Sequence, residues 1–252
     1  MTDQETLLDF LNIPLGDSDA VLKRFAALPG ADHRGSGDRQ FVFIKGTRPN
    51  RIVLIAHADT VWSSDYYKTA TPDLKIRDGI ITNANGGLGA DDRAGCAIVW
   101  LLRDMGHSIL ISNSEEQGGI GSSWLMKNHK DIRDEINENS AFALELDRRR
   151  GNRYICYNVG SEDFQAYIEK STGHIESLSG GFTDICLICE KICGVNLSIG
   201  YYNAHSEDEY LVYSEWQSTL DLCRKWLQED FPRFLRGKVI KPGSNFFTDG
   251  GR

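Results

Sequence analysis

The chain has 252 residues, of which 40% are hydrophobic, 10% aromatic and 25% charged, and its net charge is −8 at neutral pH. These are ordinary values for a globular protein, so they exclude collagen-like, coiled-coil and wholly disordered chains. Non-specific nucleic-acid binders are normally basic, so the acidic balance also argues against nucleic acid as a partner.

Apolar residues at helical spacing predict two helices near the N-terminus, at 6–11 and 18–28, followed by a glycine-rich loop at 30–39. Short apolar runs then alternate with helical patterns. Strands are predicted at 41–44, 52–56, 109–111, 142–146, 154–159 and 195–202, and helices at 93–102, 120–128, 163–170, 184–193 and 209–227. Strands that alternate with helices indicate an α/β fold whose central sheet is covered on both faces.

The longest apolar stretch spans only 94–102, whereas a membrane-spanning helix needs about 20 residues. The N-terminus carries Asp3 and Glu5 where a signal peptide needs positive charge. We therefore expect a cytoplasmic protein without a membrane partner. Its cysteines are then expected to be reduced.

Side chains that can bind metal ions follow the predicted strands or begin the helix at 93–102. They are His57, Asp59, Asp91, Asp92, Glu115, Glu116, Asp147 and His205. Ligand sites of α/β sheets lie beyond the carboxyl ends of the strands, so we expect these groups to meet in one crevice. Imidazole and carboxylate groups are good zinc ligands, and one carboxylate can bridge two metal ions.

Five segments in this order resemble the co-catalytic zinc exopeptidases. This group includes zinc aminopeptidases, tripeptidases of the T type, glutamate-releasing carboxypeptidases and aminoacylase-like deacylases. The matching segments are His57-Ala-Asp59-Thr60, Gly89-Ala-Asp91-Asp92-Arg-Ala-Gly95, Ser114-Glu115-Glu116-Gln-Gly118, Leu146-Asp147 and Ala204-His205-Ser206. The stretch Gly180-Gly-Phe-Thr183-Asp184 is similar to a substrate-wall motif of the same group.

The resemblance implies a three-layer α/β/α sandwich with a mixed, mostly parallel sheet. It implies one Zn²⁺ held by His57, Asp91 and Asp147, and a second held by Asp91, Glu116 and His205. Co²⁺ or Mn²⁺ can share such sites. Glu115 is then expected to take the proton of the attacking water, and Asp59 to fix the tautomer of His57. The resemblance also implies a cis Asp91–Asp92 peptide bond.

The segment between Asp147 and His205 is short and already holds the strands and helices that the core needs. We therefore expect a compact form without a lid, in which residues 1–234 make one catalytic domain. The tail at 235–252 is rich in Gly and has no long periodic run, so part of it is expected to be disordered. Glu145 shares a strand face with Asp147 and could compete with it as a ligand.

These residues predict a di-zinc metallopeptidase that cleaves an amide at a peptide terminus, with an aminopeptidase acting on small peptides as the first hypothesis. One alternative is an N-acyl amino acid deacylase, and another is an inactive relative that binds peptides or partners. The run 148–150, Arg-Arg-Arg, could bind a substrate carboxylate or form a solvated turn. The acidic run 207–209 could bind an amino group or begin the last helix. Oligomeric state stays open.

Overall fold

The computed structural model describes residues 1–177 and 180–237. Most of the C-terminal tail, from residue 238 onward, lies outside the described residues. The expectation that part of this tail is disordered therefore stays a prediction. Among the described residues, no helix is both long and apolar enough to cross a bilayer.

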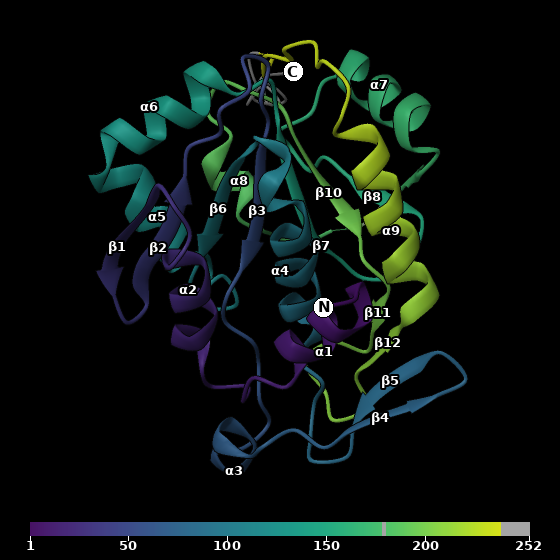
Figure 1. Cartoon of the computed structure of the whole chain (residues 1–252). Coiled ribbons are helices and arrows are strands. Elements are labelled where there is room, and N and C mark those ends of the chain that lie inside the picture. Colours follow the sequence, from purple (N-terminus) through teal and green to yellow (C-terminus); the bar gives the residue numbers. More distant parts are fainter. Residues whose placement is uncertain (178–179, 238–252) are drawn as a thin grey trace, which may run out of the picture.

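An eight-stranded mixed sheet forms the middle layer of the molecule (Figure 1). Its strands are β1 (Ala31–Ser36), β2 (Arg39–Ile44), β3 (Val53–His57), β6 (Ser108–Ser112), β7 (Ala143–Arg148), β8 (Arg153–Ile155), β9 (Ile175–Glu176) and β10 (Gly194–Ser198). They lie in the order β1-β2-β6-β3-β7-β10-β8-β9. The central pairs β6–β3, β3–β7 and β7–β10 are parallel, whereas β1–β2, β2–β6 and β10–β8 are antiparallel.

Strands β3, β6 and β10 are buried along their whole length. Val53, Leu54 and Ile55 show why: consecutive side chains of a strand point to opposite faces, and here both faces are covered by helices. The expected three-layer sandwich with a mixed, mostly parallel sheet is therefore confirmed.

The two outer layers pack against the sheet through two separate hydrophobic clusters. The first layer consists of α1 (Asp3–Leu11), α2 (Ser18–Ala26), α4 (Ala90–Leu102) with its 3₁₀ extension η1 (Arg103–Met105), α7 (Glu162–Thr172) and α9 (Tyr213–Trp226). The second consists of α5 (Ile120–Asn128), α6 (Lys130–Asn139) and α8 (Ile185–Ile188). Phe10, Phe25 and Trp216 belong to the first cluster, and Leu125 and Ile136 to the second.

A small four-stranded sheet lies at the end of the molecule toward which the arrows of β3 and β6 point (Figure 1). Its strands are β4 (Leu74–Arg77), β5 (Ile80–Asn83), β11 (Tyr201–Tyr202) and β12 (Tyr210–Val212), and the short helix α3 (Asp65–Thr69) lies nearby in the chain. The small sheet was not predicted, because its strands are too short to show a clear alternation.

Several predicted boundaries were wrong. The loop expected at 30–39 contains β1, an edge strand whose mostly polar side chains hide the apolar pattern of a strand. The strand expected at 195–202 is divided by Gly200, whose φ of +88° turns the chain into the small sheet. The helix expected from 209 begins only at Tyr213, because 210–212 pair with β5. The helix expected at 184–193 covers only α8.

Candidate metal centre

His57 is the last residue of β3 and is 1% exposed. Its Nδ1 lies 3.1 Å from the backbone carbonyl oxygen of Asp59 and 3.3 Å from Oδ1 of the same residue. Both oxygens only accept hydrogen bonds, so Nδ1 carries a proton and Nε2 is the nitrogen available to a metal ion. Nε2 is the atom that faces the crevice.

Asp91 stands between the two histidines of the site. Its Oδ1 lies 3.3 Å from His57 Nε2, and its Oδ2 lies 3.3 Å from His205 Nε2. The peptide bond between Asp91 and Asp92 is cis, as expected. One carboxylate therefore presents one oxygen to each imidazole, which is the arrangement that a bridging ligand requires.

Glu115 and Glu116 lie in the loop that follows β6. Asp59 holds this loop, because its Oδ1 accepts the backbone N–H of Glu115 at 3.0 Å and its Oδ2 accepts that of Glu116 at 3.1 Å. Glu116 Oε1 lies 2.7 Å from His205 Nε2, whereas Glu115 Oε2 lies 4.0 Å from His57 Nε2. The two neighbouring glutamates thus face different imidazoles.

Asp147 lies near the end of β7, with its Oδ1 3.6 Å from His57 Nε2. Thr183 donates a hydrogen bond to its Oδ2 at 3.2 Å, and the Tyr201 hydroxyl donates to its backbone carbonyl at 2.8 Å. The side-chain oxygen of Asn196 on β10 accepts the Asp147 backbone N–H at 3.0 Å. Partners from three segments of the chain therefore fix the position of Asp147.

His205 follows β11 in the loop that leads to β12, and its backbone has a φ of +64°. Its side chain is 48% exposed, unlike the buried His57. The structure thus brings together all seven residues that the sequence singled out for metal binding and catalysis. They are His57, Asp59, Asp91, Glu115, Glu116, Asp147 and His205.

The charges of the site act on one another strongly. Burial alone would lower the pKa of His57, but the nearby carboxylates of Asp147, Asp59 and Asp91 raise it well above its usual value. Hydrogen bonds with Asp91 and Glu116 raise the pKa of His205 to about 10. The acidic groups thus favour a positive charge at both imidazoles, which a bound cation would replace.

The residues present fit metal ions. Nε2 of His57 is buried and has no hydrogen-bond partner among the described residues, although carboxylates surround it. The ligand atoms of His57, Asp91 and Glu116 lie within 4.8 Å of one another, and so do those of His57, Asp92 and Asp147. These are the nitrogen and oxygen donors that zinc accepts.

Asp92 was not predicted to have a role of its own in the site. Its Oδ2 accepts the backbone N–H of His57 at 3.1 Å, and its Oδ1 accepts that of Gly95 at 3.2 Å. Since both oxygens already serve backbone donors, Asp147 is better placed to bind a metal ion and Asp92 to hold β3 against α4.

Glu145 is fully buried, and neither of its carboxylate oxygens has a hydrogen-bond partner among the described residues. Burial and the neighbouring charges of Asp147 and Asp184 raise its pKa well above the usual value. Glu145 belongs to neither of the two groups of converging ligand atoms, whereas Asp147 belongs to one. Among the described residues, Asp147 rather than Glu145 is therefore grouped with the other candidate ligands.

From its sequence context, Glu209 was expected either to bind an amino group or to begin the last helix. The structure places it differently, beside Asp91. It is 4% exposed, its Oε2 accepts the backbone N–H of Gly89 at 2.6 Å, and its Oε1 accepts that of Asp91 at 3.0 Å. It neither begins the last helix nor faces the crevice as an amine-binding group. Strand β12, which starts at the next residue, was not recognised from the sequence, so the helix was expected to begin at Glu209.

No protein-family model matches the sequence, and no curated protein matches it significantly. Several solved structures, however, are similar to the chain. Aminopeptidase PepT from Bacillus cereus ATCC 10987 is 14% identical with a TM-score of 0.66, over 90% of this chain and 98% of that one. A tripeptidase from Staphylococcus aureus subsp. aureus mu50 is 14% identical with a TM-score of 0.65, over 91% and 100%.

The Pyrococcus horikoshii TET1 peptidase is likewise 14% identical, with a TM-score of 0.64 over 91% of this chain and 99% of that one. That protein is described as assembling into a tetrahedron or a large octahedral shell. These structures align over nearly their whole length, so the chain shares the fold of these peptidase structures.

Proposed function

We propose that the protein is a di-zinc exopeptidase, with an aminopeptidase acting on small peptides as its most specific form. The observation that carries the proposal is the carboxylate of Asp91, whose two oxygens each lie 3.3 Å from a different imidazole, that of His57 and that of His205. The likeness to structures titled as an aminopeptidase and a tripeptidase supports it.

In this proposal His57, Asp91 and Asp147 hold one zinc ion, and Asp91, Glu116 and His205 hold the other. When bound, the pair supplies Lewis acidity, which lowers the pKa of a water molecule and polarises the scissile carbonyl. The protein positions these ligands before any metal arrives, since Asp59 fixes both the His57 ring and the loop that carries Glu116.

Glu115 is the group left to move a proton. It is 8% exposed, and its Oε2 lies 4.0 Å from His57 Nε2. Burial raises the pKa of its carboxyl to about 9 in the metal-free protein, and the positive charge of bound metal ions would lower it again, so that the carboxylate could act as a base. We assign it the role of taking the proton of the attacking water and giving it to the leaving amine.

The test uses the zinc-saturated protein with trialanine, N-acetyl-trialanine and N-acetyl-alanine as substrates. We expect about two zinc ions per chain and cleavage of trialanine alone. Glu115→Gln should keep its zinc and lose activity by roughly 10²–10⁴-fold. Glu162→Gln serves as the matched control, because Glu162 is exposed on α7, and it should stay close to wild type.

Cleavage of the acetylated substrates alone would make the protein a deacylase. A protein that binds zinc and cleaves none of the three substrates would contradict the proposal and favour a binding role. Near-normal activity of Glu115→Gln would contradict the role of Glu115 only.

A further inference from the structure

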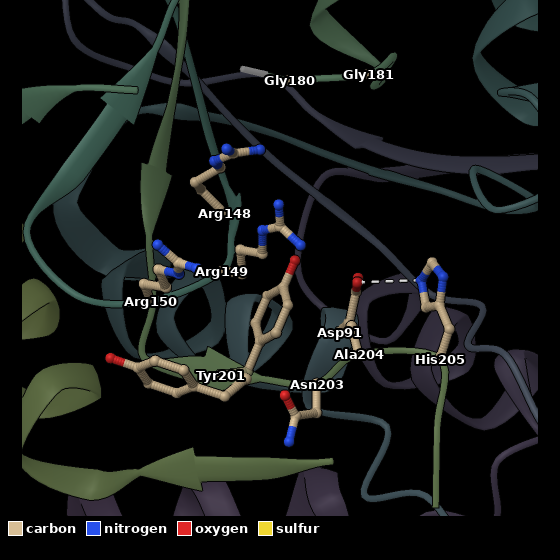
Figure 2. A pocket seen from close by; sticks show the side chains of 11 residues that line it. Asp91, Arg148, Arg149, Arg150, Gly180, Gly181, Tyr201, Asn203, Ala204 and His205 are labelled. Carbon is tan, nitrogen blue, oxygen red and sulfur yellow. Dashed lines mark ion pairs between the residues drawn. The ribbon is translucent and has the colours of Figure 1, made fainter. Parts of the chain in front are cut away.

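A hollow of about 520 Å³ adjoins the metal centre. Asp91 and His205 line it on one side, and the arginines at 148–150 line it on the other (Figure 2). Gly180, Gly181 and the tyrosines at 201–202 complete much of its wall. A substrate held at the metal centre would therefore extend within reach of the arginines.

The three arginines stand on a fixed backbone rather than on a loose turn. The carbonyl oxygen of Arg148 accepts the N–H of Ile199 at 2.8 Å, and that of Arg149 accepts the Ser198 hydroxyl at 2.9 Å. The N–H of Arg150 donates to the Tyr201 carbonyl at 2.8 Å. A fixed backbone keeps the three guanidinium groups beside the hollow, so less backbone freedom is lost when they bind a ligand.

Arg149 and Arg150 lack the counter-charge that other arginines of the chain possess. Six arginines among the described residues form ion pairs with carboxylates: Arg34, Arg48, Arg51, Arg103, Arg133 and Arg224. Within the same described ranges, no carboxylate lies within 4.0 Å of the guanidinium nitrogens of Arg149 or Arg150. Both side chains are exposed at the hollow.

Resting on the proposed function, we propose that Arg149, together with its neighbours Arg148 and Arg150, binds a carboxylate of the substrate. Guanidinium groups recognise carboxylates through paired, charge-assisted hydrogen bonds. In an acidic protein, a cationic wall beside the metal ligands selects a negatively charged group of the substrate. The carboxylate is either the C-terminus of a short peptide or the side chain of an acidic residue.

Calorimetric binding to zinc-saturated Glu115→Gln, which is expected not to cleave its ligands, separates the two sources. One pair of ligands is trialanine and its amide, which differ only at the C-terminus. The other pair is the amides of Glu-Ala-Ala and Gln-Ala-Ala, which differ only in a side-chain charge. We expect a preference of about tenfold or more for the carboxylate in one of the two pairs.

The preference should fall to within about twofold when Arg149→Gln and Arg150→Gln are combined, whereas Arg149→Lys should keep part of it because it keeps the charge. Arg153→Gln is the matched control, since Arg153 lies on β8 and lines a different hollow. None of these variants alters a proposed zinc ligand. A preference that is lost in the double variant therefore does not come from direct binding of the peptide carboxylate to zinc.

Equal affinities within both pairs would overturn the proposal, and so would a preference that survives the double substitution. The binding result does not depend on turnover. If the wild-type protein binds these peptides with the expected preference and cleaves none, the proposed function fails and the carboxylate subsite stands.

Discussion

At the scale of single residues, Asp59 links the parts of the site that come from separate strands. Its carboxylate accepts the backbone N–H groups of Glu115 and Glu116, and its Oδ1 also lies 3.3 Å from His57 Nδ1. Burial would raise the pKa of Asp59, but the interaction with His57 keeps it below the usual value. Asp59 is therefore charged at neutral pH and acts through the residues it holds.

Replacing this carboxylate by an amide should disturb the ligands without removing any of them. In Asp59→Asn one N–H donor would face a backbone N–H instead of an oxygen. We expect zinc affinity to fall roughly 10–100-fold, as is usual for groups that support metal ligands. Competition with a chelator measures it. Asp38→Asn is the control, because Asp38 contacts the same loop through Ser114 only, and an equal loss there would contradict the assignment.

Glu209 has a comparable role on the other side of Asp91. Glu209→Gln leaves one of two buried N–H donors, those of Gly89 and Asp91, without an acceptor. We expect the free energy of unfolding to fall by about 1–3 kcal/mol. Urea denaturation of the metal-free variant tests this. Asp208→Asn, an exposed neighbour, should change stability by less than about 0.5 kcal/mol, and similar losses in both variants would contradict the role given to Glu209.

At the scale of elements, the end of α9 is fastened to the sheet by two basic side chains. Arg48 donates hydrogen bonds to the carbonyl oxygens of Leu227, Gln228 and Glu229. His107 Nε2 lies 2.9 Å from the Leu227 carbonyl, while its Nδ1 accepts the backbone N–H of Ile52 at 3.3 Å. His107 must therefore be neutral to satisfy both neighbours.

The attachment of α9 should weaken in acid. Burial lowers the pKa of His107 to about 4, so between roughly pH 6.5 and 4 the unfolded chain binds a proton that the folded chain does not. The free energy of unfolding should fall across this window by up to about 3 kcal/mol on account of this residue. Urea denaturation at several pH values should show a flatter curve for His107→Gln. Parallel curves for the two proteins would contradict the assignment.

Elements with strong apolar patterns were predicted well, and those shaped by their neighbours were not. The strands β3 and β6 are covered on both faces, so their sequences are nearly continuous apolar runs. By contrast, β12 is a strand only because it pairs with β5, which is distant in the chain. The short apolar run at 210–212 was therefore assigned to the helix that follows it.

At the scale of the whole molecule, the residues of the site could be located because each follows an element whose position the fold determines. His57, Glu115 and Asp147 lie at the ends of parallel strands that share one edge of the sheet. Glu209 and the hollow lined by Arg149 depend on the small sheet, whose pairing the sequence does not show. The residues proposed as ligands were thus easier to locate from the sequence than the groups that position them.

We expect metal binding to change both the protonation and the stability of the whole molecule. The pKa of His205 is raised to about 10 and that of His57 well above its usual value, so both imidazoles carry a proton at pH 7 before metal binds. Zinc accepts only neutral imidazole, so loading should release at least these two protons per chain, together with any held by the buried carboxyl groups of the site, and should weaken as the pH falls.

Calorimetric titration with zinc in buffers of different ionisation enthalpy counts these protons. His205→Gln should release about one proton fewer than the wild type. The melting temperature should rise on loading, since a ligand at 100 times its dissociation constant adds about 2.7 kcal/mol. Heats that are the same in every buffer would show that the carboxylates around His57 and His205 do not protonate them, and the electrostatic account of the site would then be wrong.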